Sequence, residues 1–98
     1  MSNEDLIITD NEFLRQFETR INEELATIEY SQQDRKIFLT KIIMPENTED
    51  RQEDFIKAVL SEIKERNTRV VPTSPEIAGF MRRNRRKYKD LLPVGINI

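Results

Sequence analysis

Cysteine, histidine and tryptophan are absent from the 98-residue chain, and glycine occurs only twice. Without cysteine and histidine the chain has no disulfide, no thiolate nucleophile, no imidazole base and none of the usual ligands of a structural zinc site. Any catalysis must therefore use carboxylates, hydroxyls, lysine, tyrosine, backbone groups or a bound cofactor. The lack of cysteine also leads us to expect a cytoplasmic location.

Long apolar runs are missing as well. No uninterrupted apolar stretch exceeds three residues, which is far too short for a membrane-spanning helix. The first twenty residues contain Asp and Glu in place of the basic and apolar regions of a signal peptide, so we expect none. Hydrophobic residues still make up 37% of the chain, and we expect one modest core and a single domain over residues 1–98.

Charge is unevenly distributed along the chain. Residues 1–54 carry 14 acidic and 6 basic side chains, whereas residues 55–98 carry 4 acidic and 10 basic ones. Such a division indicates either two faces of one molecule that attract one another or a basic site for an anionic ligand. The sequence does not decide between them.

Alternation of apolar and polar residues predicts three consecutive strands after a loosely held acidic arm at residues 1–12. The third strand is rich in β-branched and aromatic residues and ends before Pro45, which cannot donate to a sheet. Short polar links at residues 22–24 and 31–35 favour an antiparallel meander. The predicted strands span residues 13–21, 25–30 and 36–44.

After Pro45 the apolar spacing changes to that of a helix. Phe55, Val59 and Ile63 repeat every four residues, which predicts an amphipathic helix over residues 50–66. This helix connects the predicted strand 36–44 to the next predicted strand of the sheet, at residues 68–71.

A short strand at residues 68–71 and a second helix complete the pattern. Ser74 precedes a proline and a glutamate, the residue types of an N-cap and first helical turn, and the helix should end near Asn84. An apolar tail over residues 88–98 is expected to pack against the domain.

A helix that joins two strands of one sheet returns the chain as a crossover, so strands 36–44 and 68–71 should be parallel neighbours. Each is followed at once by a chain-turning proline, and we expect the two strands to diverge at their carboxyl ends. The predicted fold class is α+β: a twisted, mostly antiparallel sheet with one parallel pair, one crossover helix and a second C-terminal helix.

Residues 28–92 resemble the minimal, single-domain branch of the GNAT N-acetyltransferases in length and in the order of their elements. The landmarks are an I-x-Y strand end at residues 28–30, the Met-Pro pair that begins at Met44, and KAVL from Lys57. The most specific match is VVPTSPEIAGFMRRN followed by KYKDLL, because the branch has V-x-P-x-C-P, a helix with an aromatic and basic residues, and a closing Tyr-x-x-Leu. The resemblance implies an acetyltransferase-like protein that transfers acetyl from acetyl-CoA to an amine.

In that family, acetyl-CoA lies between the two parallel strands where they separate. Its pyrophosphate is held by backbone N–H groups of a Gly-containing basic loop, typically R/Q-x-x-G-x-G/A, at a helix N-terminus. The resemblance therefore places acetyl-CoA along the end of strand 36–44. It implies cofactor-binding roles for Ile43, Met44, Arg51 and Gln52, catalytic candidates in Ser74 and Tyr88, and no metal.

The corresponding loop departs from the family pattern. Residues 47–54 contain no glycine, are fewer than in the usual loop, and include four carboxylates where the family has basic and small residues. Carboxylates at a helix start stabilise the helix but repel a pyrophosphate. We therefore expect weak acetyl-CoA binding or none, with a dissociation constant above the micromolar range.

Ser74 stands where the branch usually has cysteine. A cysteine at a helix N-terminus loses its proton readily, whereas a serine hydroxyl needs a base, and no histidine exists to supply one. An N-cap role for Ser74 is therefore favoured over catalysis. Tyr30 and Tyr88 have the chemistry of general acids, although packing with a surface hydroxyl is the commoner role of tyrosine.

The densest basic run of the chain follows the second predicted helix. It offers contacts to coenzyme A phosphates or to an acidic partner, and the alternative is a solvated helix end. Nucleic acid is disfavoured because Tyr88 is the only aromatic residue in the run. The run consists of Arg82, Arg83, Arg85, Arg86, Lys87 and Lys89.

Two functions of different classes therefore remain open. One is an acetyltransferase in which an amine attacks acetyl-CoA directly, a reaction that needs no enzyme nucleophile. The other is a non-catalytic GNAT-fold module that has lost acetyl-CoA binding and uses its basic face to bind a partner.

Overall fold

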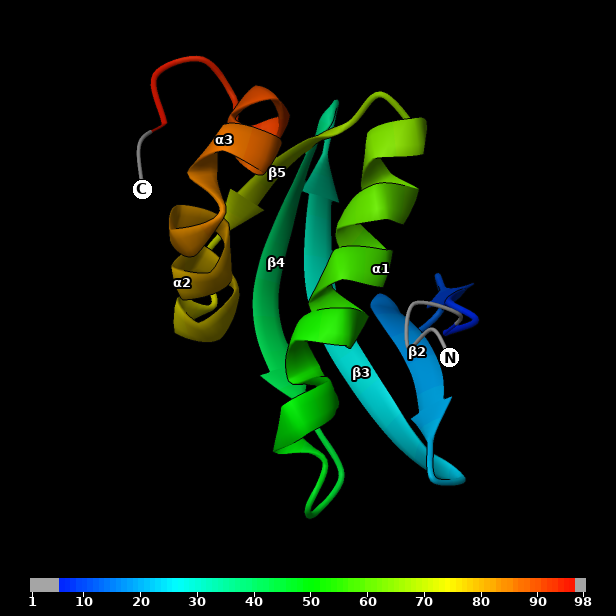
Figure 1. Ribbon diagram of the computed structural model, residues 1–98. Coiled ribbons are helices and arrows are strands. Elements are labelled where there is room, and N and C mark those ends of the chain that lie inside the picture. Colours follow the sequence, from blue (N-terminus) through cyan, green and yellow to red (C-terminus); the bar gives the residue numbers. More distant parts are fainter. Residues whose placement is uncertain (1–5, 97–98) are drawn as a thin grey trace.

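Five strands pair in chain order in a single sheet (Figure 1). The computed structural model describes residues 6–96. The first four strands pair with one another in antiparallel fashion, whereas the fifth pairs in parallel with the fourth. The predicted α+β class, with a mostly antiparallel sheet and one parallel pair, is confirmed. The strands are β1 (Thr9–Asn11), β2 (Gln16–Ile21), β3 (Glu24–Gln33), β4 (Lys36–Ile43) and β5 (Arg69–Pro72).

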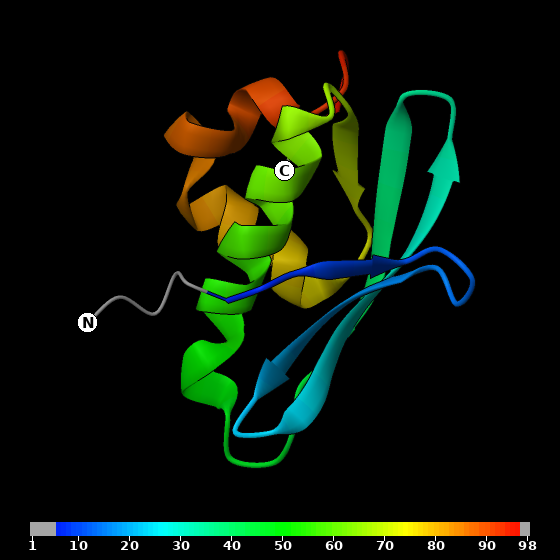
Figure 2. The ribbon, with the colours of Figure 1, turned by 90° about the vertical axis from the view of Figure 1, so that its right-hand side faces the viewer.

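The helices gather on one face of this sheet (Figure 2). The predicted crossover helix forms, and the apolar stripe of Phe55, Val59 and Ile63 is completely buried against the strands. None of the helices within residues 6–96 is long and apolar enough to cross a lipid bilayer. The helical elements are the single turn η1 (Glu49–Arg51), α1 (Gln52–Glu65), α2 (Pro75–Arg83), α3 (Arg85–Tyr88) and the single turn η2 (Lys89–Leu91).

Tight turns join the antiparallel strands without glycine. Asn22 and Glu23 both have positive φ (53° and 68°), which is the backbone conformation of a two-residue hairpin. Asp34 also has positive φ (53°) and closes the link between β3 and β4. The predicted link of residues 31–35 is therefore too long, because β3 continues to Gln33.

The described part of the N-terminal segment, residues 6–12, packs on the domain, which differs from the loosely held arm predicted for residues 1–12. Leu6 and Ile8 pack against the core, and β1 pairs with β2. The Thr19 hydroxyl donates to the Ile7 carbonyl at 3.0 Å. Residues 1–5 lie outside the described part of the chain. The strand predicted from residue 13 begins only at Gln16, since a turn with positive φ at Arg15 separates β1 from β2.

The C-terminal segment also differs from the prediction. The short helix α3 was not predicted, and it is held by Tyr88, whose ring packs against Phe80 with centroids 5.6 Å apart. The tail packs only in part, because Leu91 is buried but Val94 and Ile96 are exposed. Residues 97–98 lie outside the described range.

Candidate functional site

Strands β4 and β5 separate after a short stretch of parallel pairing. The pairing ends at Leu39, opposite Pro72. The N–H groups of Thr73 and Ser74 then both donate to the Leu39 carbonyl, at 3.0 and 2.9 Å, and the chain leaves β4 to enter α2. Residues 40–43 of β4 continue beyond the last residue that pairs with β5. The predicted parallel pair is thus confirmed, and its pairing ends before β4 does.

A bulge lies at this point of separation. Leu39 pairs with Tyr30 and Lys41 pairs with Glu29, so that Thr40 is an extra residue in β4. The Thr40 hydroxyl donates to the Glu29 carbonyl at 3.2 Å. Because a bulge bends a strand and increases its local twist, it favours the divergence of β4 from β5.

Ile43 and Met44, two of the residues assigned to the cofactor, lie at the end of the unpaired part of β4. The Ile43 side chain is 43% exposed, whereas Met44 is half-buried and packs against the core. An exposed isoleucine at a strand end could contact an apolar ligand, but Met44 already has core contacts that stabilise the fold.

The chain between β4 and α1 folds back on itself. Thr48 is buried, and its hydroxyl donates to the Pro45 carbonyl at 2.6 Å. The Arg51 N–H donates to the Thr48 carbonyl at 2.8 Å, and the Gln52 N–H donates to the Glu49 carbonyl. Two N–H groups at the start of the helix are therefore satisfied by carbonyls of the same loop. A phosphate cradle requires such groups to be free to face an anion.

The charged side chains at this helix start pair with one another. The Arg51 guanidinium lies 3.2 Å from the Asp54 carboxylate, and Arg83 of α2 lies 3.0 Å from Glu53. Glu49 and the adjoining aspartate remain exposed. Within residues 6–96 no three acidic side chains come close enough to hold a metal ion.

These residues do not fit the pyrophosphate of coenzyme A. Two of the backbone donors at this helix start are already bonded, the cation of Arg51 is paired, and exposed carboxylates give the local field the wrong sign. Gln52, the other assigned residue, is half-buried in the first turn of α1. The start of α1 therefore carries exposed carboxylates and has two N–H groups that are bonded within the preceding loop.

Ser74 is the N-cap of α2, as predicted. Its side chain is completely buried, accepts a hydrogen bond from the Ile77 N–H at 3.4 Å, and donates to the Glu76 carboxylate at 3.0 Å. Proline at the next position supplies the helical φ in advance. The Ser74 hydroxyl thus both donates and accepts a hydrogen bond and has no exposed surface. These features suit a helix cap.

Replacing Ser74 with alanine is expected to lower the free energy of unfolding by about 0.5–2 kcal/mol, because the N–H of Ile77 loses its acceptor in a buried position. Urea denaturation followed by circular dichroism measures this loss. Ser31→Ala is the control, since Ser31 is exposed, and it should change stability by less than about 0.5 kcal/mol. Equal stability of the Ser74→Ala protein and the wild type, with loss of a transferase activity, would restore a catalytic role for Ser74.

Tyr88 lies apart from Ser74 and the assigned cofactor residues. It is buried in α3, and its ring packs against Phe80 of α2. Burial raises the pKa of its hydroxyl, which weakens it as a general acid. It lines a groove between α1 and α3 whose walls include neither Ser74 nor residues 43–52. The groove that Tyr88 lines therefore does not include the separating strands.

The predicted basic run forms a surface that we call the basic cluster: Arg82, Arg83, Arg85, Arg86, Lys87 and Lys89. Five of its members line one shallow groove of about 520 Å³, and only Lys89 is outside it. Asn84 interrupts the helix between α2 and α3, and its side-chain amide donates to the Phe80 carbonyl at 2.8 Å. This break lets cations from two successive helices share one concave surface.

Two features were not predicted from the sequence. The first is a polar network in which the Tyr30 hydroxyl donates to Asp10 at 2.6 Å and Arg66 lies 2.8 Å from the same carboxylate. Burial and the hydrogen bond to Asp10 raise the pKa of Tyr30 to about 12. The network joins β1, β3 and the end of α1.

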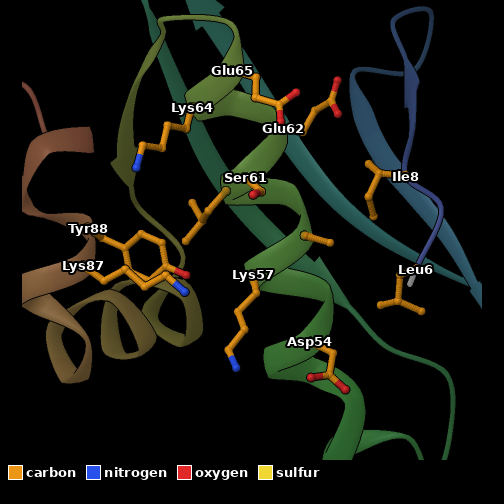
Figure 3. A pocket seen from close by; sticks show the side chains of 12 residues that line it. Leu6, Ile8, Asp54, Lys57, Ser61, Glu62, Lys64, Glu65, Lys87 and Tyr88 are labelled. Carbon is orange, nitrogen blue, oxygen red and sulfur yellow. The ribbon is translucent and has the colours of Figure 1, made fainter. Parts of the chain in front are cut away.

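The second feature is the groove between α1 and α3 that Tyr88 lines (Figure 3). Lys57, Ser61 and Lys64 recur at helical spacing on the face of α1 opposite its apolar stripe, and this spacing was the available signal. The N-terminal residues that complete the groove had been assigned to the loose arm.

A mixed sheet with a crossover helix and a separating parallel pair defines an acetyltransferase-like α+β domain. Residues 16–91 match the family described as GCN5-related N-acetyl-transferase, so the chain belongs to that family. The fold is similar to the solution structure of a GCN5-like putative N-acetyltransferase from Staphylococcus aureus. That similarity has a TM-score of 0.61 and 22% sequence identity, and it covers 99% of this chain and 94% of the other. Comparison with curated proteins gives no match.

Proposed function

We propose that this chain is a GNAT-fold domain that does not hold acetyl-CoA in the family's position and acts as a non-catalytic binding module. The observation that carries the proposal is the loop between β4 and α1, in which the N–H groups of Arg51 and Gln52 are bonded to carbonyls of the same loop and the exposed charges are acidic. An anionic cofactor gains little at such a helix start. A cytoplasmic location is part of the proposal.

The binding surface in this proposal is the basic cluster, and its partner is acidic. Arg83 is already paired with Glu53, but Arg82, Arg86 and Lys89 make no ion pair within residues 6–96. Like charges placed close together favour an anionic partner, because its approach relieves their mutual repulsion. The phosphates of coenzyme A would be attracted by these cations, but they would lack the loop of free backbone N–H groups that holds them in the family.

Acetyl transfer to an amine is the second candidate. The separation of β4 from β5 favours acetyl transfer, because the resemblance places acetyl-CoA between these two strands. The cofactor-binding assignments of Ile43, Met44, Arg51 and Gln52, and the catalytic assignments of Ser74 and Tyr88, belong to this second candidate.

Calorimetric titration with acetyl-CoA distinguishes the two functions. We expect a dissociation constant above the micromolar range, which corresponds to binding weaker than about −8 kcal/mol. The titration is run at low and moderate salt, because binding through the basic cluster alone weakens as salt increases. Micromolar or tighter binding at moderate salt would favour acetyl transfer over the non-catalytic binding module.

A further inference from the structure

The groove between α1 and α3 combines an apolar floor with a cationic wall. Its volume is about 400 Å³. Its accessible apolar part consists of Ala58 of α1 with Leu6 and Ile8 of the N-terminal segment, all half-buried. Leu6 and Ile8 lie across α1 from Tyr88 and Lys87 (Figure 3). A groove of this size accommodates one or two apolar side chains.

Three lysines stand on the α3 side of this groove. Figure 3 shows Lys57 and Lys64 extending from α1 on the same side as Lys87 and Tyr88. None of the three makes an ion pair within residues 6–96, and Lys87 lies over the Tyr88 ring at 5.6 Å. Their ammonium groups are therefore available to an incoming anion.

Most of the acidic side chains in the groove are already neutralised. Asp54 is paired with Arg51, and Glu62 is paired with Arg66 at 3.3 Å. Glu65 has no such partner in the described part of the chain. The three lysines and three carboxylates of the lining balance formally, but two of the carboxylates are paired with arginines outside the groove, so unpaired positive charge remains on the α3 side.

The groove is continuous with the other cationic surfaces through Lys87. This lysine also lines the groove of the basic cluster, and with Lys64 it lines a third groove that contains Arg35 and Arg69. The apolar floor is thus the centre of a larger basic surface that extends over α1, α3 and the start of β5.

From this arrangement we infer that the groove between α1 and α3 binds an acidic amphipathic segment of a partner protein. Apolar side chains of the segment contact the half-buried Ala58, Leu6 and Ile8, and its carboxylates face Lys57, Lys64 and Lys87. The inference rests on the proposed function as a binding module and names the chemistry of its partner.

A protein segment fits these observations better than a nucleic acid does. A sugar-phosphate backbone gains nothing from an apolar floor, and single strands are bound through aromatic rings on which bases stack. Tyr88 is only 6% exposed and has Lys87 over its ring, so it offers no such platform.

The test uses a fluorescein-labelled peptide of about 16 residues in which leucines repeat at helical spacing and glutamates fill the other positions. Fluorescence anisotropy is measured with the full chain. We expect saturable binding that weakens when serine replaces the leucines, when glutamine replaces the glutamates, and when salt is raised.

Lys57→Gln/Lys87→Gln is expected to weaken peptide binding by about tenfold or more, because two of the three cations of the groove wall are lost. Lys64→Gln provides a second, milder variant of the same wall. The matched control is Arg15→Gln/Arg20→Gln, which removes the same charge from exposed positions outside the groove and should change the affinity by less than about twofold.

Unchanged affinity in both lysine variants would overturn the inference. So would equal binding of the serine peptide, equally tight binding of a single-stranded oligonucleotide of the same charge, or sedimentation showing a dimer that the lysine variants dissociate. Acetyl-CoA is titrated separately into the same preparation. Micromolar binding there contradicts the proposed function, whereas failure of the peptide alone contradicts only this inference.

Discussion

Replacing Phe80 with alanine is expected to lower the free energy of unfolding by about 3–5 kcal/mol, a large fraction of the stability of a small domain. Phe80 of α2 is 1% exposed, and its ring packs against Tyr88 of α3 with the centroids 5.6 Å apart. Truncation leaves a cavity at the contact that holds α3. Urea denaturation gives the change in free energy.

The chain supplies a matched control for this substitution. Phe13 is 93% exposed in the turn between β1 and β2, so Phe13→Ala should change stability by less than about 0.5 kcal/mol. Amide hydrogen exchange should also become faster across α3 in the Phe80 variant, because this helix has few other buried contacts. An equally small loss in the free energy of unfolding for Phe80→Ala and Phe13→Ala would show that Phe80 does not stabilise α3.

Replacing Tyr30 with phenylalanine is expected to lower the free energy of unfolding by about 1.5–3 kcal/mol at neutral pH, because its hydroxyl donates to the carboxylate of Asp10 at 2.6 Å. The loss should also loosen β1, which this bond connects to β3. Thermal or urea denaturation of the two proteins at pH 7 measures the difference.

The pH dependence of this difference tests its cause. Burial, followed by the hydrogen bond to Asp10, raises the pKa of Tyr30 from 10.0 to about 12 in the folded protein. Between these values the unfolded chain loses the proton while the folded chain keeps it, so stability falls as pH rises. The advantage of the wild type over Tyr30→Phe should therefore shrink by roughly 1–2 kcal/mol between pH 10 and 12. A constant difference over this range would show that Tyr30 titrates normally.

Local patterns predicted most of the α+β fold. The four-residue spacing of Phe55, Val59 and Ile63 specified both the helix and the face that it buries, since only a helix places these side chains on one stripe. The order of strands and helix then required β4 and β5 to be parallel. Ser74 was identified as a cap because the cap depends on residues within one helical turn.

Elements that depend on distant contacts were not predicted. β1 is three residues long, too short for any periodicity, and it is held by Asp10 through Tyr30 and Arg66. α3 is four residues of mostly basic sequence, held by the packing of Tyr88 on Phe80. Neither contact is visible without the tertiary structure.

In the candidate sites, too, local features could be predicted from the sequence, whereas features that depend on distant contacts could not. The acidic character of the loop before α1 is visible in the sequence, but the bonding of its N–H groups to its own carbonyls is not. The groove between α1 and α3 requires three segments that are far apart in the chain, with Ile8, Lys57 and Lys87 as examples. Of this groove, the sequence alone shows only the helical spacing of Lys57 and Lys64 on α1.

Amide chemical shifts during titration with acetyl-CoA test the central claim most directly, namely that the loop between β4 and α1 no longer forms a cofactor cradle. With ligand raised to about 1 mM, we expect no saturating shifts over residues 44–54, and any changes should be weak, sensitive to salt and confined to the basic cluster. Saturating shifts centred on residues 44–54, with a midpoint in the micromolar range or below, would contradict the account and identify the chain as an acetyl-CoA-binding protein.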